Sequence, residues 1–503
     1  MPEPRPIRKV LILGGGTAGW MTASALATLL PQLEISLVES DDIGTVGVGE
    51  ATIPQIHLFT RMLGIGDSDI LRETQATYKL GIEFDGWREP GKAYLHPFGS
   101  YGEPYGGAAF HQIWLARNRQ GTALPLDQYN LTAQACRAGR YTDPAHHDPR
   151  SPLSRLFSAW HFDAGLFAGL LRRIAEARGV TRHEGKVSGH SRCAETGDIT
   201  SLTLEDGRSF EADLYLDCSG FRSLLLGGAL DVGYTGWTEH LPNDRAIALP
   251  SSPLSPLPAF TRATAREAGW QWRIPLQHRT GNGYVFSSAY LDEDKAMGGV
   301  EGMVEGEILA EPRLLRFTPG HRKRMWQNNV VAIGLSAGFL EPLESTSIHL
   351  IQQAIMHLAN LLPRSFPAPA ATAEFNRTMT AEFEAIRDFL FLHFWANRRP
   401  EPYWRDRRET PLPETLKRKV EMWREAGHIA RDGHDLFAEA SWVAVLLGQG
   451  LVPESCSPLV DTLPQATLDR HLQTIPATIA RTVSAMPDHA RYIRERMNRT
   501  ART

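Results

Sequence analysis

The N-terminal part of the chain alternates between short apolar runs and segments of mixed character. Residues Val10–Leu13 form an apolar run that stops at consecutive glycines, and residues Ala18–Leu30 then have the composition of a helix. A second, mostly apolar run, Ile35–Val38, ends at Glu39. The succession of strand, tight turn, helix and strand predicts the opening of a parallel α/β sheet.

The central part of the chain carries further patterns of both periods. Apolar and polar residues alternate over residues 78–85, which predicts one strand. The residues expected on one face of this strand are Tyr78, Leu80, Ile82 and Phe84. Residues 98–107 are rich in glycine and are expected to form a loop, whereas residues 163–178 are expected to be helical. Residues 199–217 predict a β-hairpin that turns at Asp206–Gly207.

Towards the C-terminus the pattern becomes mainly helical. Residues Val330–Gly334 predict another buried strand and residues Ser345–Leu362 a helix. From about Ala371 onward the sequence is polar with interspersed tryptophans, which favours helices. The Pro/Ala-rich stretch Pro363–Ala371 is the expected boundary, so we predict one module over residues 1–370 and a helical region over residues 371–503.

Composition narrows the class of protein. The 503 residues suffice for a substantial core, and 42% hydrophobic with 22% charged residues is an ordinary balance for a soluble globular protein. The net charge of -4 argues against nucleic-acid binding. The four cysteines lack paired spacing, so neither a metal nor a disulfide framework is expected. No apolar run has membrane-spanning or signal-peptide length, which favours a cytoplasmic protein with no membrane partner.

A glycine motif follows the first predicted strand. Gly14, Gly16 and Gly19 form GxGxxG at the junction of strand and helix. These glycines permit a tight turn, a close approach of the backbone to a pyrophosphate, and close packing of helix on strand. The helix N-terminus offers N–H groups and a positive dipole end to phosphates, and Glu39 can accept hydrogen bonds from ribose hydroxyls. The pattern predicts a dinucleotide site; the alternative is a purely structural glycine turn.

Two later segments favour FAD over NAD. Residues Asp213–Gly220, DLYLDCSG, form an apolar strand that ends in a turn of small residues, as in flavoproteins near the dinucleotide. Residues Val330–Gly338, VVAIGLSAG, resemble the late flavin-contacting segment of the para-hydroxybenzoate-hydroxylase fold. The chain has a single GxGxxG and no apparent second nucleotide domain for NAD(P)H. We therefore expect the protein to receive FAD already in its reduced form.

Five segments in order along the chain make a more specific resemblance. They are GGGTAGW at 14–20, GVGEATIP at 47–54, YKLGIEF at 78–84, WQWRIP at 270–275 and EPLESTS at 341–347. With these motifs the chain resembles the flavin-dependent tryptophan halogenase family over most of its length, and WxWxIP separates that family from flavin monooxygenases. The resemblance implies an α/β fold class, an FAD-binding Rossmann-like fold of the para-hydroxybenzoate hydroxylase type with an added helical C-terminal region.

The resemblance also assigns contents to the two predicted regions. Residues 1–370 would contain the FAD-binding and substrate-sheet parts, interleaved, and residues 371–503 would complete the substrate pocket. The implied activity uses reduced FAD, oxygen and chloride or bromide to form hypohalous acid, which halogenates an aromatic ring. The sequence leaves the choice between the two halides open.

Two residues would carry the chemistry. Lys79 matches the catalytic lysine of the family; a primary amine can hydrogen-bond hypohalous acid or form a haloamine with it, and desolvation would lower its pKa. A solvated lysine is the alternative for an isolated strand position. Glu344 matches the glutamate that stabilises the cationic ring intermediate and takes up the ring proton. Its alternative is a carboxylate at the N-terminal end of a helix dipole.

N–H groups and a hydroxyl at a helix start suit a small anion, and the resemblance implies that Thr346 and Ser347 bind the halide. Simple helix capping is the alternative, and many relatives carry glycine where Ser347 stands. Trp270 and Trp272 are expected to form an aromatic wall between flavin and substrate. The residues expected to bind the substrate, in part by stacking on its ring, are His96, Phe98 and Phe110, in the loop region after the lysine strand, and Trp442.

Further cofactor contacts are expected around the dinucleotide. The segment 47–54 would form a mobile strap over the flavin, with backbone freedom from Gly47 and Gly49. The complete set of expected cofactor contacts is Gly14, Gly16, Thr17, Ala18, Gly19, Glu39, Gly49, Glu50, Ala51, Val187, Gly334, Leu335 and Ile348.

One departure from the family bears on the substrate. Members that act on free tryptophan bind its amine and carboxylate with C-terminal residues, including an adjacent tyrosine pair and a later acid with neighbouring aromatics. Here Trp442 is followed by Val443 and Ala444, and Glu454 by Ser455–Cys456. We therefore expect indole or an indole derivative without the amino-acid head. The other expected partners are a halide, a separate flavin reductase and a second copy of the chain in a homodimer.

Alternative functions remain at the level of the sequence. A free-tryptophan halogenase and a halogenase for a carrier-tethered pyrrole or phenol would differ in the C-terminal region. An FAD-dependent monooxygenase would share the nucleotide motifs but would not need WxWxIP together with Lys79 and Glu344. A non-enzymatic flavin-binding protein would not need the lysine and the glutamate either.

Overall fold

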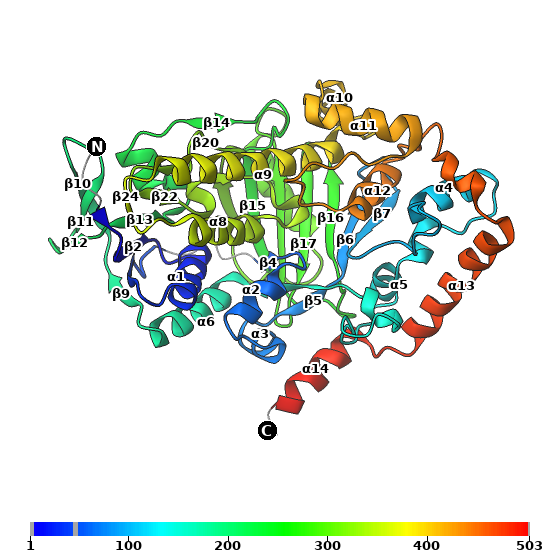
Figure 1. The fold of residues 1–503 in the computed structure, drawn as a ribbon, viewed down its shortest axis with the longest axis horizontal. Helices are drawn as coiled ribbons and strands as arrows, with labels where there is room; N and C mark the ends of the chain where they lie inside the picture. The colour runs from blue at the N-terminus through cyan, green and yellow to red at the C-terminus, as the bar shows by residue number, and fades with distance from the viewer. Residues whose placement is uncertain (1–4, 44–48, 501–503) are drawn as a thin grey trace. The chain divides into compact units, whose positions relative to one another are not determined.

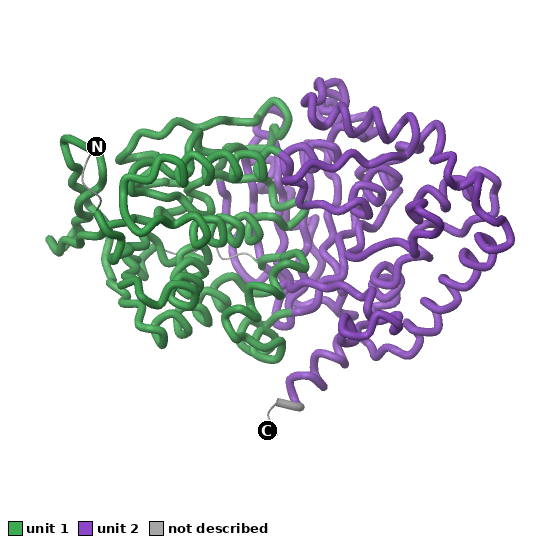
Figure 2. Tube along the Cα trace, in the orientation of Figure 1, with its two compact units in different colours: residues 1–76, 162–244, 316–384 green, residues 77–161, 245–315, 385–503 purple. Residues whose placement is uncertain are grey.

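The computed structural model describes residues 5–43 and 49–500 (Figure 1). The chain divides into two compact units, each assembled from three separate stretches (Figure 2). Unit 1 comprises residues 1–76, 162–244 and 316–384, and unit 2 comprises residues 77–161, 245–315 and 385–503. The expected boundary at residue 370 was based on a change in sequence composition, which is a different criterion from the contacts that define the two units. It stays a prediction.

Unit 1 is built on a six-stranded sheet in the order β21-β22-β13-β2-β3-β9. Its strands run parallel except for β21, because short Val-, Ile- and Leu-rich runs suit strands buried on both faces. The predicted strands around residues 10–13 and 35–38 are confirmed. The hairpin near Asp206–Gly207 is confirmed as well.

The strands assigned to unit 1 are β1 (Arg5–Pro6), β2 (Lys9–Leu13), β3 (Glu34–Glu39), β4 (Gly49–Ala51), β9 (Thr181–Glu184), β10 (Val187–Arg192), β11 (Ile199–Leu204), β12 (Ser209–Glu211), β13 (Leu214–Asp217), β14 (Tyr234–Gly236), β20 (Gly320–Arg322), β21 (Trp326–Gln327), β22 (Val330–Ala332), β23 (Gly338–Phe339) and β24 (Ser365–Phe366).

Helix α1 occupies a central place in unit 1. Residues Gly19–Ala27 are all buried, and the helix packs against α6 and α8. Small side chains in α1 let these neighbours approach closely. The helices of unit 1 are α1 (Thr17–Leu29), α2 (Ile56–Met62), α3 (Asp67–Glu73), α6 (Ala164–Ala177), α8 (Ser347–Leu361) and the first part of α9 (Pro369–Trp395).

Unit 2 is built on a seven-stranded, mainly antiparallel sheet in the order β19-β15-β18-β17-β16-β6-β7. Strands β5 and β8 belong to a second, three-stranded sheet. The strands of unit 2 are β5 (Thr77–Lys79), β6 (Gly81–Asp85), β7 (Ala93–Pro97), β8 (Ala159–Asp163), β15 (Arg245–Ser251), β16 (Thr261–Arg266), β17 (Gly269–Pro275), β18 (Thr280–Phe286) and β19 (Arg313–Arg316). Its complete helices are α4 (Phe110–Arg119), α5 (Leu131–Arg137), α7 (Glu293–Val300), α10 (Pro402–Glu409), α11 (Glu414–Ala426), α12 (Glu439–Gly448), α13 (Gln465–Ser484) and α14 (His489–Thr500).

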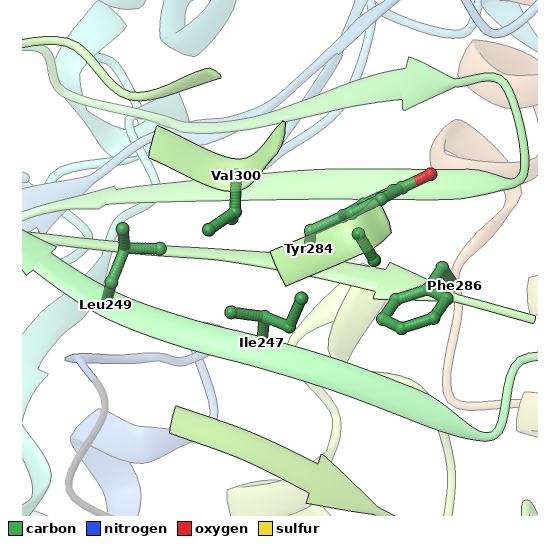
Figure 3. Close-up of a cluster of buried hydrophobic side chains, with 6 residues drawn as sticks. Ile247, Leu249, Tyr284, Phe286 and Val300 are labelled. Atoms are coloured by element: carbon green, nitrogen blue, oxygen red, sulfur yellow. The ribbon is translucent and has the colours of Figure 1, made fainter. Parts of the chain in front are cut away.

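A compact apolar cluster covers part of the unit 2 sheet (Figure 3). Ile247 and Leu249 of β15 lie beside Tyr284 and Phe286 of β18, and Val300 of α7 closes the cluster. Burying such side chains stabilises the fold by about 1.5–3 kcal/mol each. This packing makes the sheet a rigid support for β17, which pairs with β18 along its full length.

The single strand expected over residues 78–85 is wrong. The structure has two strands, β5 and β6, interrupted at Leu80, whose N–H donates to the carbonyl of Ala259 at 2.7 Å. The break arises because Gly81 packs directly on the backbone of His96. An added Cβ on Gly81 would lie 2.6 Å from the carbonyl oxygen of His96. Strand β5 therefore pairs with β8 instead of continuing along the large sheet.

Two smaller expectations also need correction. Helix α8 begins at Ser347, because Ser345 adopts a left-handed conformation (φ 59°) and Thr346 is the N-cap. His96 and Phe110 do not belong to a loop: His96 is part of β7, and Phe110 is the first residue of α4. Within residues 5–43 and 49–500, no helix is long and apolar enough to cross a membrane.

Candidate functional site

The GxGxxG turn adopts the geometry that its glycines predict. Gly14 has φ 112°, and an added Cβ would lie 2.3 Å from the carbonyl oxygen of Cys218. At Gly19, an added Cβ would lie 1.8 Å from the carbonyl oxygen of Gly14, so helix and turn pack in contact. At Gly16, by contrast, no heavy atom of the described residues, its chain neighbours apart, lies within 4 Å of an added Cβ. Gly16 therefore faces a space that a phosphate group of a ligand can enter.

The first turn of α1 is prepared for an anion. Its N-cap is Gly16, no side chain caps the helix in the described structure, and no acidic residue lies in its first turn. The N–H groups of Thr17 and Ala18 thus retain hydrogen-bonding capacity at the positive end of the helix dipole. This arrangement fits a pyrophosphate.

Glu39 stands at the carboxyl end of β3, beside the same turn. Its Oε1 accepts a hydrogen bond from Nε of Arg182 at 2.6 Å, which fixes the carboxylate. Its Oε2 points at the turn, because an added Cβ on Gly15 would lie 1.3 Å from it. Arg182 was not expected from the sequence, since its pairing with Glu39 depends on the parallel pairing of β3 with β9.

The other expected cofactor residues of unit 1 gather at the same edge of the sheet. Strands β2, β13 and β22 are parallel neighbours, so the segments that follow them meet at their carboxyl ends. Gly334 has φ 77°, and an added Cβ would lie 2.8 Å from the Cβ of Ala18. Leu335 follows it in the same turn, half-buried.

A cavity of about 190 Å³ extends from the end of β3 towards the start of β10. It is lined by Ser40, Asp42, Glu184, Gly185, Lys186, Leu204, Glu205 and Asp206. Val187, an expected cofactor residue, follows Lys186 directly.

Only part of the expected strap is described. Gly47 lies outside the described residues, whereas Gly49, Glu50 and Ala51 form β4. Burial raises the pKa of Glu50 to about 7, so this carboxyl group ionises less readily than an exposed glutamate.

Lys79 is fully buried in unit 2, which excludes the solvated alternative. Its Nζ lies 5.3 Å from the centre of the Phe98 ring, within the range of a cation–π contact. Both residues are positioned by backbone bonds around the β5–β6 break, where the N–H of Phe98 donates to the carbonyl of Leu80 at 2.9 Å. The expected catalytic lysine and one expected substrate residue are thus neighbours.

An aromatic cluster includes two of the expected substrate residues. Phe389 stacks on Phe437 with ring centres 3.8 Å apart, and Trp442 meets Phe389 edge-on at 4.9 Å. His96 lies 5.9 Å from Phe389 and 6.4 Å from Phe437. We call His96, Phe389, Phe437 and Trp442 the aromatic cluster. Phe110 packs elsewhere, on Tyr129 at 5.1 Å and His471 at 6.3 Å.

Sequence reasoning missed Phe389 and Phe437. Each lies far in sequence from the lysine strand and in no motif, and only the tertiary fold brings them to His96. The tryptophans interspersed after residue 371 were the available signal, and they did not point to these two phenylalanines.

A buried ion pair lies against the cluster. Lys419 of α11 places its Nζ 4.9 Å from the ring centre of Trp442 and 2.5 Å from Oδ2 of Asp435. Both charged side chains are almost fully buried. Because each neutralises the other, the pair supports the tryptophan without presenting an uncompensated charge.

The WQWRIP strand β17 is buried along its whole length. Trp270 and Trp272 share one face, with ring centres 6.2 Å apart. Gly283 of β18 leaves room for the second indole, because an added Cβ there would lie 2.0 Å from the Trp272 ring. The Nε1 of Trp272 is buried and has no hydrogen-bond partner within the described residues. A wall of two indoles is therefore present.

The EPLESTS segment belongs to unit 1, whereas Lys79 belongs to unit 2. Glu344 is 1% exposed, and Thr346 is fully buried at the N-cap of α8. The Oγ1 of Thr346 has no hydrogen-bond partner in the described part of the chain, so it does not act as a side-chain cap. Ser347 and Ile348 begin the helix, and their N–H groups lie at the positive end of its dipole. A buried hydroxyl beside such N–H groups suits a small anion.

These features define a class of protein. A parallel sheet with a dinucleotide turn is combined with a substrate sheet that holds a buried lysine and an aromatic cluster, which is the combination expected of a flavin-dependent halogenase. Residues 9–465 match the family model described as tryptophan halogenase. The chain therefore belongs to the tryptophan halogenase family.

Individual relatives agree with this assignment. The tryptophan 7-halogenase of Lentzea aerocolonigenes is 36% identical over 92% of this chain and 93% of its own. The solved structure of a flavin-dependent halogenase from Xanthomonas campestris is 45% identical, with a TM-score of 0.94 and 98% of each chain covered. One from Brevundimonas sp. BAL3 is 47% identical, with a TM-score of 0.93, covering 97% of this chain and 99% of the other.

The predicted fold class and activity class are thereby confirmed. The protein is an enzyme, a flavin-dependent halogenase with an FAD-binding Rossmann-like fold. Flavin dependence implies FAD as cofactor, and the open space at Gly16, the uncapped start of α1 and the carboxylate of Glu39 fit that cofactor. Among the described residues, no group of three or more His, Cys, Asp or Glu side chains is arranged to hold a metal ion.

Proposed function

We propose that this enzyme halogenates indole or an indole derivative, using chloride or bromide, oxygen and reduced FAD from a separate flavin reductase. The observation that carries the proposal is the fully buried Lys79 beside Phe98, in the same unit as the aromatic cluster. Curated relatives are tryptophan 7- and 6-halogenases, which supports a substrate of the indole class.

The residues of unit 1 would hold the cofactor and the halide. The α1 N-terminus and Gly16 would bind the pyrophosphate, and Glu39 the ribose. When bound, reduced FAD supplies the chemistry that activates oxygen and converts halide to hypohalous acid. Thr346 and Ser347 would hold the halide through the free hydroxyl and the helix N–H groups.

Lys79 and Glu344 would act in the transfer of halogen to the ring. Lys79, in its protonated form, donates a hydrogen bond to the oxygen of hypohalous acid and gives that oxygen the proton with which it leaves as water. A carbon–halogen bond forms on the substrate ring as the oxygen–halogen bond breaks. The carboxylate of Glu344 then takes up the proton lost by that ring carbon. Burial of both groups strengthens these electrostatic interactions.

The aromatic cluster would receive the indole ring. Flat rings gain from offset stacking and edge contacts of the kind that Phe389, Phe437 and Trp442 already make with one another. Lys419, whose Nζ lies over the Trp442 ring, is already paired with the carboxylates of Asp435 and Asp432. Glu454 is exposed, and Val443 and Ala444 are buried and apolar. These features favour a substrate without an ammonium and a carboxylate.

A competition assay tests the proposal. The purified enzyme, a flavin reductase, NADH, FAD and oxygen are combined with equal concentrations of indole and tryptophan, with bromide and chloride in separate reactions. Mass spectrometry should show halogenated indole as the main product. A clear preference for tryptophan would contradict the substrate proposal, and absence of any halogenated aromatic product would contradict the activity.

A further inference from the structure

A chain of buried hydrogen bonds is attached to the strand that carries Lys79. Strand β5 contains only Thr77, Tyr78 and Lys79, so the side chains of Thr77 and Lys79 project to the same face. Oγ1 of Thr77 lies 2.7 Å from the carbonyl oxygen of Pro275 and 3.0 Å from Nδ1 of His161. Nε2 of His161 in turn lies 2.9 Å from Oγ1 of Thr261.

The direction of each hydrogen bond in this chain follows from its fixed end. The carbonyl of Pro275 can only accept, so the single hydroxyl proton of Thr77 must be donated to it. Nδ1 of His161 must then donate to Thr77, which leaves Nε2 as an acceptor for the hydroxyl proton of Thr261. A neutral imidazole satisfies all of these bonds at once.

The surroundings keep the imidazole neutral. His161 is fully buried, and burial together with the positive charge of Lys79 holds its pKa well below the usual range. The backbone N–H of Tyr78 donates to Nε2 of His489 at 3.2 Å, so a second buried imidazole fixes the middle residue of β5. Two of the three residues of β5, Thr77 and Tyr78, are thus hydrogen-bonded to buried histidines.

This series of hydrogen bonds joins four strands. Thr77 belongs to β5, His161 to β8, Thr261 to β16, and Pro275 closes β17, the WQWRIP strand. Strand β5 is too short to be held by its own ladder alone, because it pairs with β8 at only three positions. The side-chain bonds therefore set where β5 lies relative to the aromatic wall strand.

We propose that Thr77, His161 and Thr261 are positioning residues that hold Lys79 at a fixed place relative to the β17 strand. This inference rests on the proposed role of Lys79 in halogen transfer. A displacement of a reacting group by about 1 Å can cost roughly 100-fold in rate. Without these hydrogen bonds, the amine of Lys79 would no longer meet hypohalous acid at the substrate, and more of that acid would escape from the enzyme.

The matched pair Thr77→Val and Thr77→Ser tests this role. Valine keeps the shape and removes the hydroxyl, whereas serine keeps the hydroxyl and removes a methyl group. With reduced FAD, bromide and indole, we measure bromoindole formed and hypobromite captured by a β-diketone trap, each per flavin oxidised. Thr77→Val should give about ten-fold or more less bromoindole with a matching rise in trapped hypobromite. Thr77→Ser should stay near the parental ratio. The pair Thr261→Val and Thr261→Ser repeats the test at the other end, in case Thr77→Val does not fold.

The outcomes separate the inference from the proposed function. A merely structural role would lower the melting temperature of the valine variants but leave the product ratio of the folded enzyme unchanged, and that result overturns the inference. Lys79→Ala, assayed in parallel, should also release hypobromite. If Lys79→Ala brominates indole at the parental rate, the proposed role of the lysine fails. If Lys79→Ala loses bromination while a folded valine variant keeps the parental ratio of bromoindole to trapped hypobromite, the role of the lysine stands. Only the positioning role of Thr77, His161 and Thr261 is then overturned.

Discussion

Lys79 carries its amine into the interior of unit 2. Removing an amine from water is costly, and the face of the Phe98 ring lies 5.3 Å from its Nζ. A fold that keeps such a group buried is expected to use it. We therefore expect the buried amine to be retained because it takes part in the halogen-transfer step.

Replacement of Lys79 gives the most direct prediction at this scale. Lys79→Ala should leave FAD binding and reduced-flavin oxidation nearly intact while halogenated indole falls roughly 100-fold or more, because the amine acts only after hypohalous acid has formed. Lys417→Ala, at an exposed position of α11, is the control and should behave as the parent. The measurements are flavin oxidation by absorbance, product by mass spectrometry and melting temperature. Parental product yield in folded Lys79→Ala would contradict the lysine mechanism.

Glu344 should have a weaker effect. Glu344→Gln keeps the shape of the side chain and removes the charge that would take up the ring proton. Product formation should slow, but by less than in Lys79→Ala, because other groups can accept a proton. Single-turnover kinetics with reduced FAD compare the two variants directly. An equal or larger loss in Glu344→Gln would show that proton removal, and not halogen delivery, limits the reaction.

His489 predicts how stability depends on pH. Burial lowers the pKa of His489 to about 4, below the value of 6.5 of the unfolded chain. The unfolded state therefore binds a proton that the folded state refuses, so stability present above pH 6.5 is lost as the pH falls towards 4, by about 1.4 kcal/mol per pH unit. His161 acts in the same direction.

Urea unfolding at about pH 7.5 and about pH 5.5 measures this dependence. His489→Gln keeps an acceptor for the N–H of Tyr78 but does not titrate, so its stability should fall less between the two pH values than that of the parent. His190→Gln, on the exposed surface of β10, controls for loss of an imidazole and should follow the parent. Equal slopes in parent and His489→Gln would contradict the assignment.

At the scale of elements, the β2–α1 turn makes a testable prediction about the cofactor. Gly16→Ala should fold normally, because its φ of -73° suits alanine and no atom lies near the new Cβ. The methyl group would occupy the space expected for the pyrophosphate and weaken FAD binding by about ten-fold or more, about 1.4 kcal/mol or more. Gly16→Trp should abolish binding.

Fluorescence titration of FAD into the apo-protein tests this placement. Gly169→Ala is the matched control, since it too meets no atom within 4 Å but lies in α6. It should bind FAD as the parent does. Unchanged FAD affinity in folded Gly16→Trp would show that the pyrophosphate lies elsewhere.

The elements also show what the sequence could and could not predict. Strands β2 and β3 and helix α1 were predictable because local periodicity and a glycine turn determine them. The break at Leu80 was not, because it depends on the contact of Gly81 with the chain at His96. Lys79 and Glu344 could be named from motifs, whereas Phe389, Phe437 and the hydrogen bonds of His161 arise from contacts between distant segments.

At the scale of the whole molecule, residues 385–503 of the C-terminal region belong to unit 2. Nη1 of Arg399 donates to the carbonyl of Gly86 at 2.8 Å, and Nε1 of Trp404 donates to that of Arg266 at 2.7 Å. The sheet strands β6 and β16 thus depend on residues beyond 370 for their packing and hydrogen bonds.

A chain that stops at residue 370 should therefore not fold cooperatively, because unit 2 would lose residues 385–503. We expect insoluble protein, or soluble protein without a sharp thermal transition in circular dichroism. Co-expression of residues 371–503 as a separate polypeptide should increase the soluble yield. A cooperative transition in the isolated 1–370 fragment would instead support the residue 370 boundary as a folding boundary.

The interleaving of the two units has a consequence for biosynthesis. Translation proceeds from the N-terminus, yet unit 1 lacks its last stretch until residue 384 has emerged from the ribosome. Unit 2, begun at residue 77, remains unfinished until nearly the whole polypeptide has been made. Both units are therefore incomplete until residue 384 has been made, and unit 2 for longer, so nascent chains carry exposed apolar strands for much of translation. We expect slower translation, lower growth temperature and added chaperones to raise the recovery of active enzyme from recombinant hosts.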